Sequence, residues 1–204
     1  MPIVNQANGL LAEFAIFPVE PDRQASLVKQ TIQNIESVLK HKVGFTSGSV
    51  LRSRDGLRVT SYVQWADQES YIATQSFTDF VVPDVHLFEI FAAEPKDSEL
   101  HLSSSMDGLI NFGIFKMKQP ENQPRFIDLF RQALEMVSGQ PGLISTHAHR
   151  SLEGLRCINF GHWRSLEEYT AMDSNHPFSS VFGEMLDLAD NEYQKTLHEV
   201  VFTT

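Results

Sequence analysis

The sequence has a single cysteine, few cationic residues and no long apolar run. Cys157 alone cannot form an internal disulfide or a thiolate metal cluster. Sixteen basic residues against twenty-six acidic ones give a formal charge of -10, which disfavours nucleic acid and anionic membrane surfaces as partners. No run of 18 apolar residues occurs, and the opening residues MPIVNQANG do not resemble a secretion signal, so we expect a cytoplasmic protein with no membrane association.

Common catalytic signatures are also missing. The chain contains no GxGxxG, GxxxxGK[ST], HExxH, GxSxG or paired CxxC motif, which argues against nucleotide binding and nucleophilic-serine chemistry. The fractions of hydrophobic residues (42%) and charged residues (21%) are those of an ordinary globular protein. We therefore expect a folded protein, in which no motif indicates a metal or a cofactor.

The sequence does contain an internal repeat. With a fixed shift of 98 residues, positions 14–73 lie over positions 112–171 without a gap, and 14 of the 60 pairs are identical. Trp65 and Tyr71 match Trp163 and Tyr169 in this alignment. A repeat of this length indicates two copies of one structural unit.

Each copy has the pattern of a βαββαβ unit. A short apolar strand precedes a helix, two strands follow around a hairpin turn at Gly56 or Gly154, and a second helix and a last strand complete the unit. The last strands are expected at 85–91 and 197–202. The apolar stripe of the first helix consists of Val28, Ile32, Ile35 and Leu39 in one copy, and of Phe126, Phe130, Ala133 and Val137 in the other.

A four-stranded sheet with both helices on one face leaves its other face bare, and the sister unit is the obvious cover. We predict an α+β fold of two fused ferredoxin-like βαββαβ units packed sheet to sheet, a dimeric α+β barrel within one chain. The expected domains are residues 1–98 and 107–204, joined by a surface linker over 94–107. We expect a compact monomer, and the fused pseudo-dimer leaves a further homo-oligomer open.

A candidate site lies on the third strand of the second copy. Alternation puts residues 155, 157, 159, 161 and 163 on one face, and Asn159 is the polar exception among them. Asn159, Trp163 and Tyr169 then surround an apolar pocket. In the alternative interpretation the two aromatic residues are only core residues, and Asn159 faces solvent.

The first copy offers weaker candidates for substrate binding. It keeps Trp65 and Tyr71 but has Ser61 where the second copy has Asn159. The second copy also carries 14 extra residues, around 176–191, where a further helix is expected. His176 and Phe178 in this segment either line a lid over the pocket or belong to a turn.

Four histidines form two pairs, one with a spacing of two residues and one at equivalent positions of the two copies. His147 and His149 share one face of a strand, which a metal can use, but no third ligand is apparent and a solvent-exposed face is the favoured interpretation. His86 and His198 recur at the starts of the last strands, where we expect structural roles.

The repeated motifs resemble the antibiotic biosynthesis monooxygenase domain family of the dimeric α+β barrel superfamily, once per half. The residues that carry the resemblance are Phe17-Pro-Val19, Gly44-Phe45, Ser53-Arg-Asp-Gly56, Ser61-Tyr-Val-Gln-Trp65 with Tyr71, and Asn159-Phe-Gly-His-Trp163 with Tyr169. The second half is most similar to cofactor-free anthrone oxygenases of aromatic polyketide pathways, which place an Asn four residues before the Trp and a Tyr six residues after it.

Two departures qualify this resemblance. The anthrone oxygenases use an arginine about fourteen residues beyond the tyrosine, where this chain has Gly183 or Val85. The haem-degrading branch has a ligand histidine ten residues after the tryptophan, where this chain has Gln75 or Asp173, so haem is not expected.

The resemblance implies a cofactor-independent monooxygenase that oxidises an electron-rich phenol, anthrone or hydroquinone with O2. Asn159 and Trp163 would donate hydrogen bonds to the developing oxyanion, and Tyr169 would move a proton. We expect the second half to carry the working site. The alternatives are a non-catalytic module that binds a small aromatic molecule or assists assembly, and an isomerase on the same fold.

Overall fold

The structure is a computed structural model that describes residues 1–75, 85–173, 179–193 and 196–204. Both halves contain the expected βαββαβ order. The elements of the first half are β1 (Ile3–Val4), β2 (Leu11–Pro18), α1 (Gln24–Ser37), β3 (Phe45–Ser53), β4 (Arg58–Trp65), α2 (Gln68–Gln75), β5 (Val85–Glu94) and β6 (Leu100–His101). Those of the second half are β7 (Leu109–Met117), α3 (Gln123–Val137), β8 (Leu143–Ser151), β9 (Arg156–Trp163), α4 (Leu166–Asp173), α5 (Ser179–Leu188), β10 (Ala189–Tyr193) and β11 (His198–Thr203).

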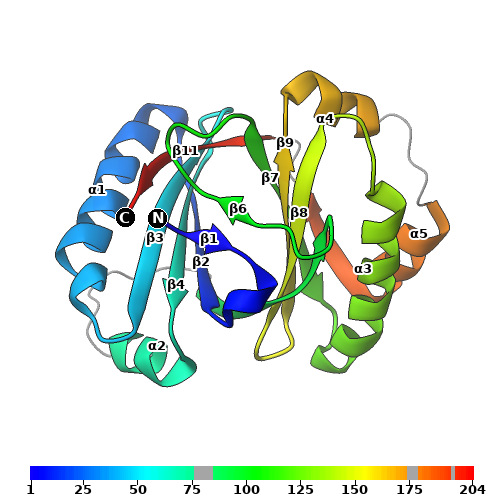
Figure 1. Cartoon of the computed structure of the whole chain (residues 1–204), viewed down its shortest axis with the longest axis horizontal. Helices are drawn as coiled ribbons and strands as arrows, with labels where there is room; N and C mark the ends of the chain where they lie inside the picture. The colour runs from blue at the N-terminus through cyan, green and yellow to red at the C-terminus, as the bar shows by residue number, and fades with distance from the viewer. Residues whose placement is uncertain (76–84, 174–178, 194–195) are drawn as a thin grey trace.

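The strands of the two halves form one closed barrel. Around the ring the order is β7-β11-β3-β4-β2-β5-β8-β9, and pairing of β9 with β7 closes it, while β10 lies beside β7 as an additional strand. Helices α1 and α2 lie on one side of the barrel and α3, α4 and α5 on the other (Figure 1). The predicted fused α+β barrel is confirmed.

The last strand of each half joins the two sheets. Strand β5 pairs with β2 of its own half over Val85–Phe88 and then with β8 of the other half over Phe88–Glu94. In the same way β11 pairs once with β7, at His198 and Ile110, and then runs along β3. Because β5 and β11 each pair with strands of both halves, each half covers an open strand edge of the other half.

Aromatic side chains fill the inside of the barrel. Phe14 packs edge to face on Tyr62, Phe88 and Phe112, with ring centroids 5.0, 5.2 and 6.0 Å apart. All four are at most 2% exposed. Such contacts stabilise beyond the burial of area alone. The outer faces of the same strands pack against the helices, so the pleat separates a central core from two outer cores.

The gap-free alignment of the two copies is wrong by one residue in the first helix. Gln24 Nε2 donates to the carbonyls of Ser53 and Arg58, and Gln123 Nε2 donates to those of Ser151 and Arg156. The strand positions differ by 98, whereas 123 minus 24 is 99. The reason is that β7 extends one residue further than β2 before its helix begins.

The segment 94–107 is more than a surface linker. Its strand β6 pairs with β1, and Val4, Leu100 and Leu102 are at most 4% exposed and belong to the central core. Gln64 Nε2 also donates to the carbonyl of Ile3. The prediction of a linker that only crosses the surface was wrong, because these apolar side chains cover one end of the barrel.

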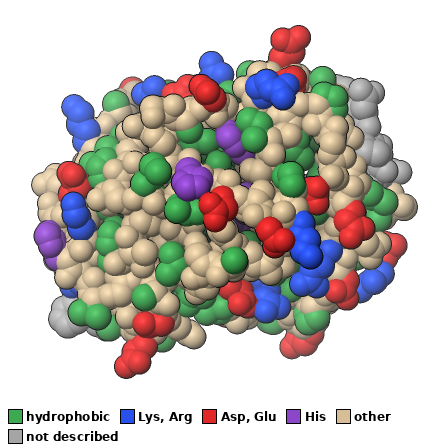
Figure 2. Space-filling view, in the orientation of Figure 1, with side chains coloured by type: hydrophobic (Ala, Val, Ile, Leu, Met, Phe, Trp, Pro, Cys, Tyr) green, Lys and Arg blue, Asp and Glu red, His purple; other side chains and the backbone are tan. Residues whose placement is uncertain are grey.

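The additional residues of the second half form both the expected helix and an unexpected strand. Helix α5 packs against α3, and β10 pairs with β7 in antiparallel register from Ala189–Met117 to Tyr193–Gly113. None of the helices within the described ranges is long and apolar enough to cross a membrane. On the face that carries β1 and β6, acidic, basic and apolar side chains are interspersed (Figure 2).

Candidate functional site

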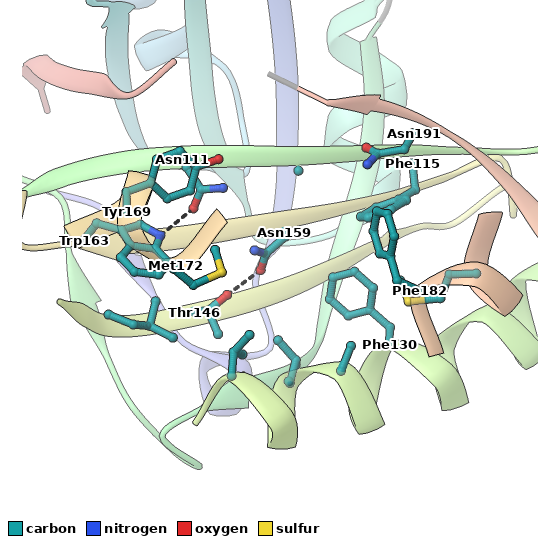
Figure 3. A pocket seen from close by; sticks show the side chains of 16 residues that line it. Asn111, Phe115, Phe130, Thr146, Asn159, Trp163, Tyr169, Met172, Phe182 and Asn191 are labelled. Atoms are coloured by element: carbon teal, nitrogen blue, oxygen red, sulfur yellow. Dashed lines mark hydrogen bonds between the residues drawn. The ribbon is translucent and has the colours of Figure 1, made fainter. Parts of the chain in front are cut away.

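A cavity of about 150 Å³ lies between the outer face of the second half's strands and helices α3, α4 and α5. This volume alone matches one benzene ring, but the described residues enclose the cavity only in part, so a larger ring system can extend beyond it. The lining is mostly apolar, with a few polar side chains (Figure 3). The lining residues are Asn111, Gly113, Phe115, Phe130, Ala133, Leu134, Val137, Leu143, Thr146, Asn159, Trp163, Tyr169, Met172, Phe182, Met185 and Asn191.

Asn159 lies at the middle of the cavity wall. It pairs with Gly113 on one neighbouring strand and with Ala148 on the other, and its side chain leaves the sheet on the helix side (Figure 3). The Thr146 hydroxyl donates to Asn159 Oδ1. Within the described residues Nδ2 makes no hydrogen bond, so Asn159 presents a donor to the cavity rather than to bulk solvent.

Trp163 makes a bond that the sequence analysis did not anticipate. Its indole Nε1 donates to Asn111 Oδ1 at 2.9 Å, and both residues are buried. A Cβ at Gly161 would collide with Asn111 Oδ1, so glycine leaves room for this pair. The indole N–H is therefore engaged within the protein, which departs from the expectation that it points at a substrate.

Tyr169 stands at the same end of the cavity as Trp163. It is 3% exposed, and its ring packs on the indole with a centroid distance of 5.2 Å in an edge-to-face arrangement. Helix α4 places it there, and Ser165 Oγ caps this helix by accepting from the Glu168 amide at 3.2 Å. The structure thus brings Asn159, Trp163 and Tyr169 to one cavity.

Three polar lining residues were not predicted: Asn111, Thr146 and Asn191. Asn111 had a signal in the sequence, because the repeat places it over Glu13, a second polar residue in an otherwise apolar strand. Asn191 had none, because β10 itself was not expected.

The first half uses its equivalent residues differently. Ser61, Trp65 and Tyr71 lie on the α1 side of the barrel and do not line the cavity beside Asn159. Trp65 Nε1 donates to Glu13 Oε2 at 3.0 Å. Burial raises the pKa of Glu13 to about 7, and the bond from Trp65 opposes this shift.

The space on the helix side of the sheet also differs between the two halves. In the first half, a Cβ on Gly48 would lie only 3.1 Å from Ile35 Cγ2, so Ile35 occupies the space above that strand position. In the second half the same strand position holds Thr146, which lines the cavity.

The histidines on β8 point into the barrel, contrary to the favoured solvent-exposed interpretation. His147 and His149 are 0% exposed, because alternation on this strand directs them to the central core. His149 Nδ1 donates to the His147 carbonyl at 3.1 Å, and burial, followed by repulsion from His147, lowers the pKa of His149 to about 3. Within the described ranges, no group of three or more His, Cys, Asp or Glu side chains could hold a metal.

The remaining candidates have simpler positions. His86 Nδ1 lies 2.7 Å from Glu153 Oε1 at the start of β5, and His198 is buried against Phe112 at the start of β11. Burial raises the pKa of the Cys157 thiol to about 12. His176 and Phe178 lie outside the described residues.

Comparison with known proteins agrees with this geometry. Residues 102–180 match the family model "Antibiotic biosynthesis monooxygenase". Tetracenomycin-F1 monooxygenase of Streptomyces glaucescens is 30% identical over 73 residues, which are 36% of this chain. The chain spans 65% of that relative's length.

Solved structures show the fold along the whole chain. An anthrone oxidase-like protein superposes with a TM-score of 0.86 at 16% identity, covering 100% of this chain and 96% of the other. A monooxygenase-like structure from Fusobacterium nucleatum superposes with a TM-score of 0.58 at 13% identity, covering 95% and 93%. Residues 102–180, which supply most of the cavity lining, are thus similar to the antibiotic biosynthesis monooxygenase family.

Proposed function

We propose that the protein is a cofactor-independent monooxygenase that oxidises an electron-rich phenol, anthrone or hydroquinone with O2. The observation that carries this proposal is Asn159 Nδ2, which bonds to none of the described residues and lies in an apolar cavity beside Trp163 and Tyr169. The family-model match of residues 102–180 and the anthrone oxidase-like fold support it. The small aromatic substrate and O2 would be the only reactants.

The proposed chemistry balances without a further reductant. For an anthrone, the substrate enters as its phenolate and transfers one electron to O2, giving a substrate radical and superoxide. These combine through a new carbon–oxygen bond, and a proton converts the peroxide anion into a hydroperoxide. Loss of water then leaves a carbonyl, so one oxygen atom enters the product and the other leaves with the two hydrogens of the carbon.

The cavity residues have distinct parts in this scheme. Asn159 Nδ2 donates to the phenolate oxygen, and Thr146 holds the amide in that orientation through its bond to Oδ1. The Tyr169 hydroxyl gives the proton to the peroxide. Trp163 is a positioning residue, because its N–H holds Asn111 and its ring packs on Tyr169.

We propose further that only the second half is catalytic. Ser61 replaces the amide in the first half, and a hydroxyl offers one donor where an amide offers two. Ile35 fills space above Gly48, whereas the second half keeps a cavity beside Thr146. The first half then contributes its strands to the barrel.

Oxygen consumption with a panel of anthrones and hydroquinones tests the proposal. Metal-free protein should consume O2 above the buffer rate with at least one of them. Ala133 lines the cavity, so Ala133→Leu should block this uptake, whereas Gln132→Leu on the exposed face of α3 should not. If ligands bind to the cavity but no O2 is consumed, the protein is a non-catalytic binder instead.

A further inference from the structure

We infer that Asn191 is a second polar anchor of the cavity, which binds a hydroxyl group at the end of an aromatic ligand remote from Asn159. This inference rests on the proposed function only for the identity of the ligand class. Its structural basis is the extension that only the second half has, and it concerns binding rather than oxidation.

The strand register places Asn191 on the same face as Asn159. Asn191 pairs with Phe115 on one edge of β7, and Asn159 pairs with Gly113 on the other edge. Directly paired residues of adjacent strands point to the same side, and positions 113 and 115 share a face. Two strand spacings and two residues of rise separate the Cα atoms of Asn159 and Asn191 by about 12 Å. Figure 3 shows the two amides at separate places along one cavity.

Asn191 breaks the pattern of its own strand. Its neighbours Asp190 and Glu192 are exposed, as expected for the outward face, and Ala189 on the inward face is 0% exposed. An apolar residue would complete this alternation at position 191. The sequence instead places a carboxamide there, among Phe115, Phe182 and Met185.

The Oδ1 atom of Asn191 is buried and accepts no hydrogen bond from any described residue. Buried polar atoms without a partner are rare and cost free energy, so a bound group that completes the bond gains from doing so. A hydroxyl suits this amide in either orientation, because it can donate to the oxygen and accept from the nitrogen.

The preference among aromatic ligands follows from the two amides together. Asn159 offers a donor for one oxygen and Asn191 a partner for another, with aromatic and aliphatic side chains between them. The cavity therefore favours aromatic molecules that carry oxygen substituents at opposite ends over those with one substituent.

Anaerobic calorimetry with naphthalen-1-ol and naphthalene-1,5-diol tests the inference apart from oxygen chemistry. Asn191→Leu, which keeps the branched shape and the number of heavy atoms and removes the polar group, should weaken binding of the diol by roughly 3- to 10-fold, the effect of one hydrogen bond, and leave binding of naphthalen-1-ol unchanged. Asp190→Asn on the opposite face of β10 should change neither. Asn191→Ala repeats the measurement if leucine disturbs the packing, as judged by thermal unfolding.

The outcomes separate the two proposals. Equal losses for both ligands, or no loss for either, overturn the role of Asn191. If the wild-type protein binds neither ligand, the cavity is no aromatic site, and this inference falls together with the proposed function. If the predicted selectivity is found but no substrate consumes O2, only the oxygenase proposal fails.

Discussion

Glu13 Oε2 accepts a hydrogen bond from Trp65 Nε1, in the place where Asn111 accepts one from Trp163 in the other half. The equivalent indole is thus held by a carboxyl group in the first half and by an amide in the second half. The carboxyl lies in a site that resists its charge, since burial raises the pKa of Glu13 to about 7. This relationship makes the stability of the protein depend on pH.

Glu13→Gln should therefore stabilise the protein at neutral and alkaline pH. The unfolded chain releases this proton near pH 4.5 and the folded protein near pH 7, so the free energy of unfolding of the wild type falls as pH rises through that window. At about 1.4 kcal/mol per pKa unit, the gain of the variant between pH 4.5 and pH 8 should be on the order of 3 kcal/mol. Urea unfolding at a series of pH values measures it. Glu20→Gln, at an exposed position, is the matched control, and parallel curves for wild type and Glu13→Gln would contradict the prediction.

His149→Leu should make the protein less sensitive to acid. The folded pKa of His149, about 3, lies below the usual 6.5, so its stabilising effect is present above pH 6.5 and is lost as pH falls toward 3. Leucine is the residue at the matching strand position, Leu51, which is also buried in the central core. The loss of stability between pH 7.5 and pH 5 should shrink by about 2 kcal/mol.

Chemical denaturation at those two pH values checks this prediction. Some acid sensitivity should remain, because burial also lowers the pKa of His198, to about 4. An unchanged difference between the two pH values in His149→Leu would show that this side chain is protonated in the folded protein.

Asn159→Ala should lower oxygenase activity by on the order of 100-fold, the usual loss for one oxyanion donor. Ser61→Ala should leave the rate nearly unchanged, because Ser61 lies in the other half and does not line the cavity. Steady-state oxygen uptake gives both rates, and circular dichroism of both variants excludes unfolding as a cause. A larger loss in Ser61→Ala would reverse the proposed assignment of the working half.

Separate production of residues 1–106, which keep β6 with β1, and of residues 107–204 should give two chains that do not fold as monomers. Strand β3 would lack β11 and strand β8 would lack β5, so each fragment would expose an unpaired edge and an apolar sheet face. Mixing the fragments should restore the near-native circular dichroism spectrum of the intact chain. Cooperative unfolding of either fragment as a monomer would show that the halves are independent.

Much of the barrel could be predicted because the repeat carries information about the strands. The tryptophan and the hairpin glycine recur at a constant spacing, and the alternation along β9 correctly directs Asn159 to the helix side. The helix register could not be read in this way. The longer strand β7 and the side-chain bonds of Gln24 and Gln123 reveal the extra residue before α3.

The rest of the site depends on contacts between distant segments. Strand β10 is short and polar, and its pairing with β7 spans more than 70 residues of sequence, so nothing local marks Asn191 as inward-facing. The bond between Trp163 and Asn111 likewise joins two strands whose pairing follows only from the complete sheet.

The pairing of β11 with β3 also bears on how the protein is made. A ribosome delivers β3 early, but the strand that covers its edge, His198–Thr203, emerges after all other strands of the barrel. Until then the nascent chain presents an open strand edge, which is a template for pairing with other chains. Translation that stops short of residue 198 should release an aggregation-prone product, so we expect the nascent chain to depend on chaperones until β11 has left the ribosome.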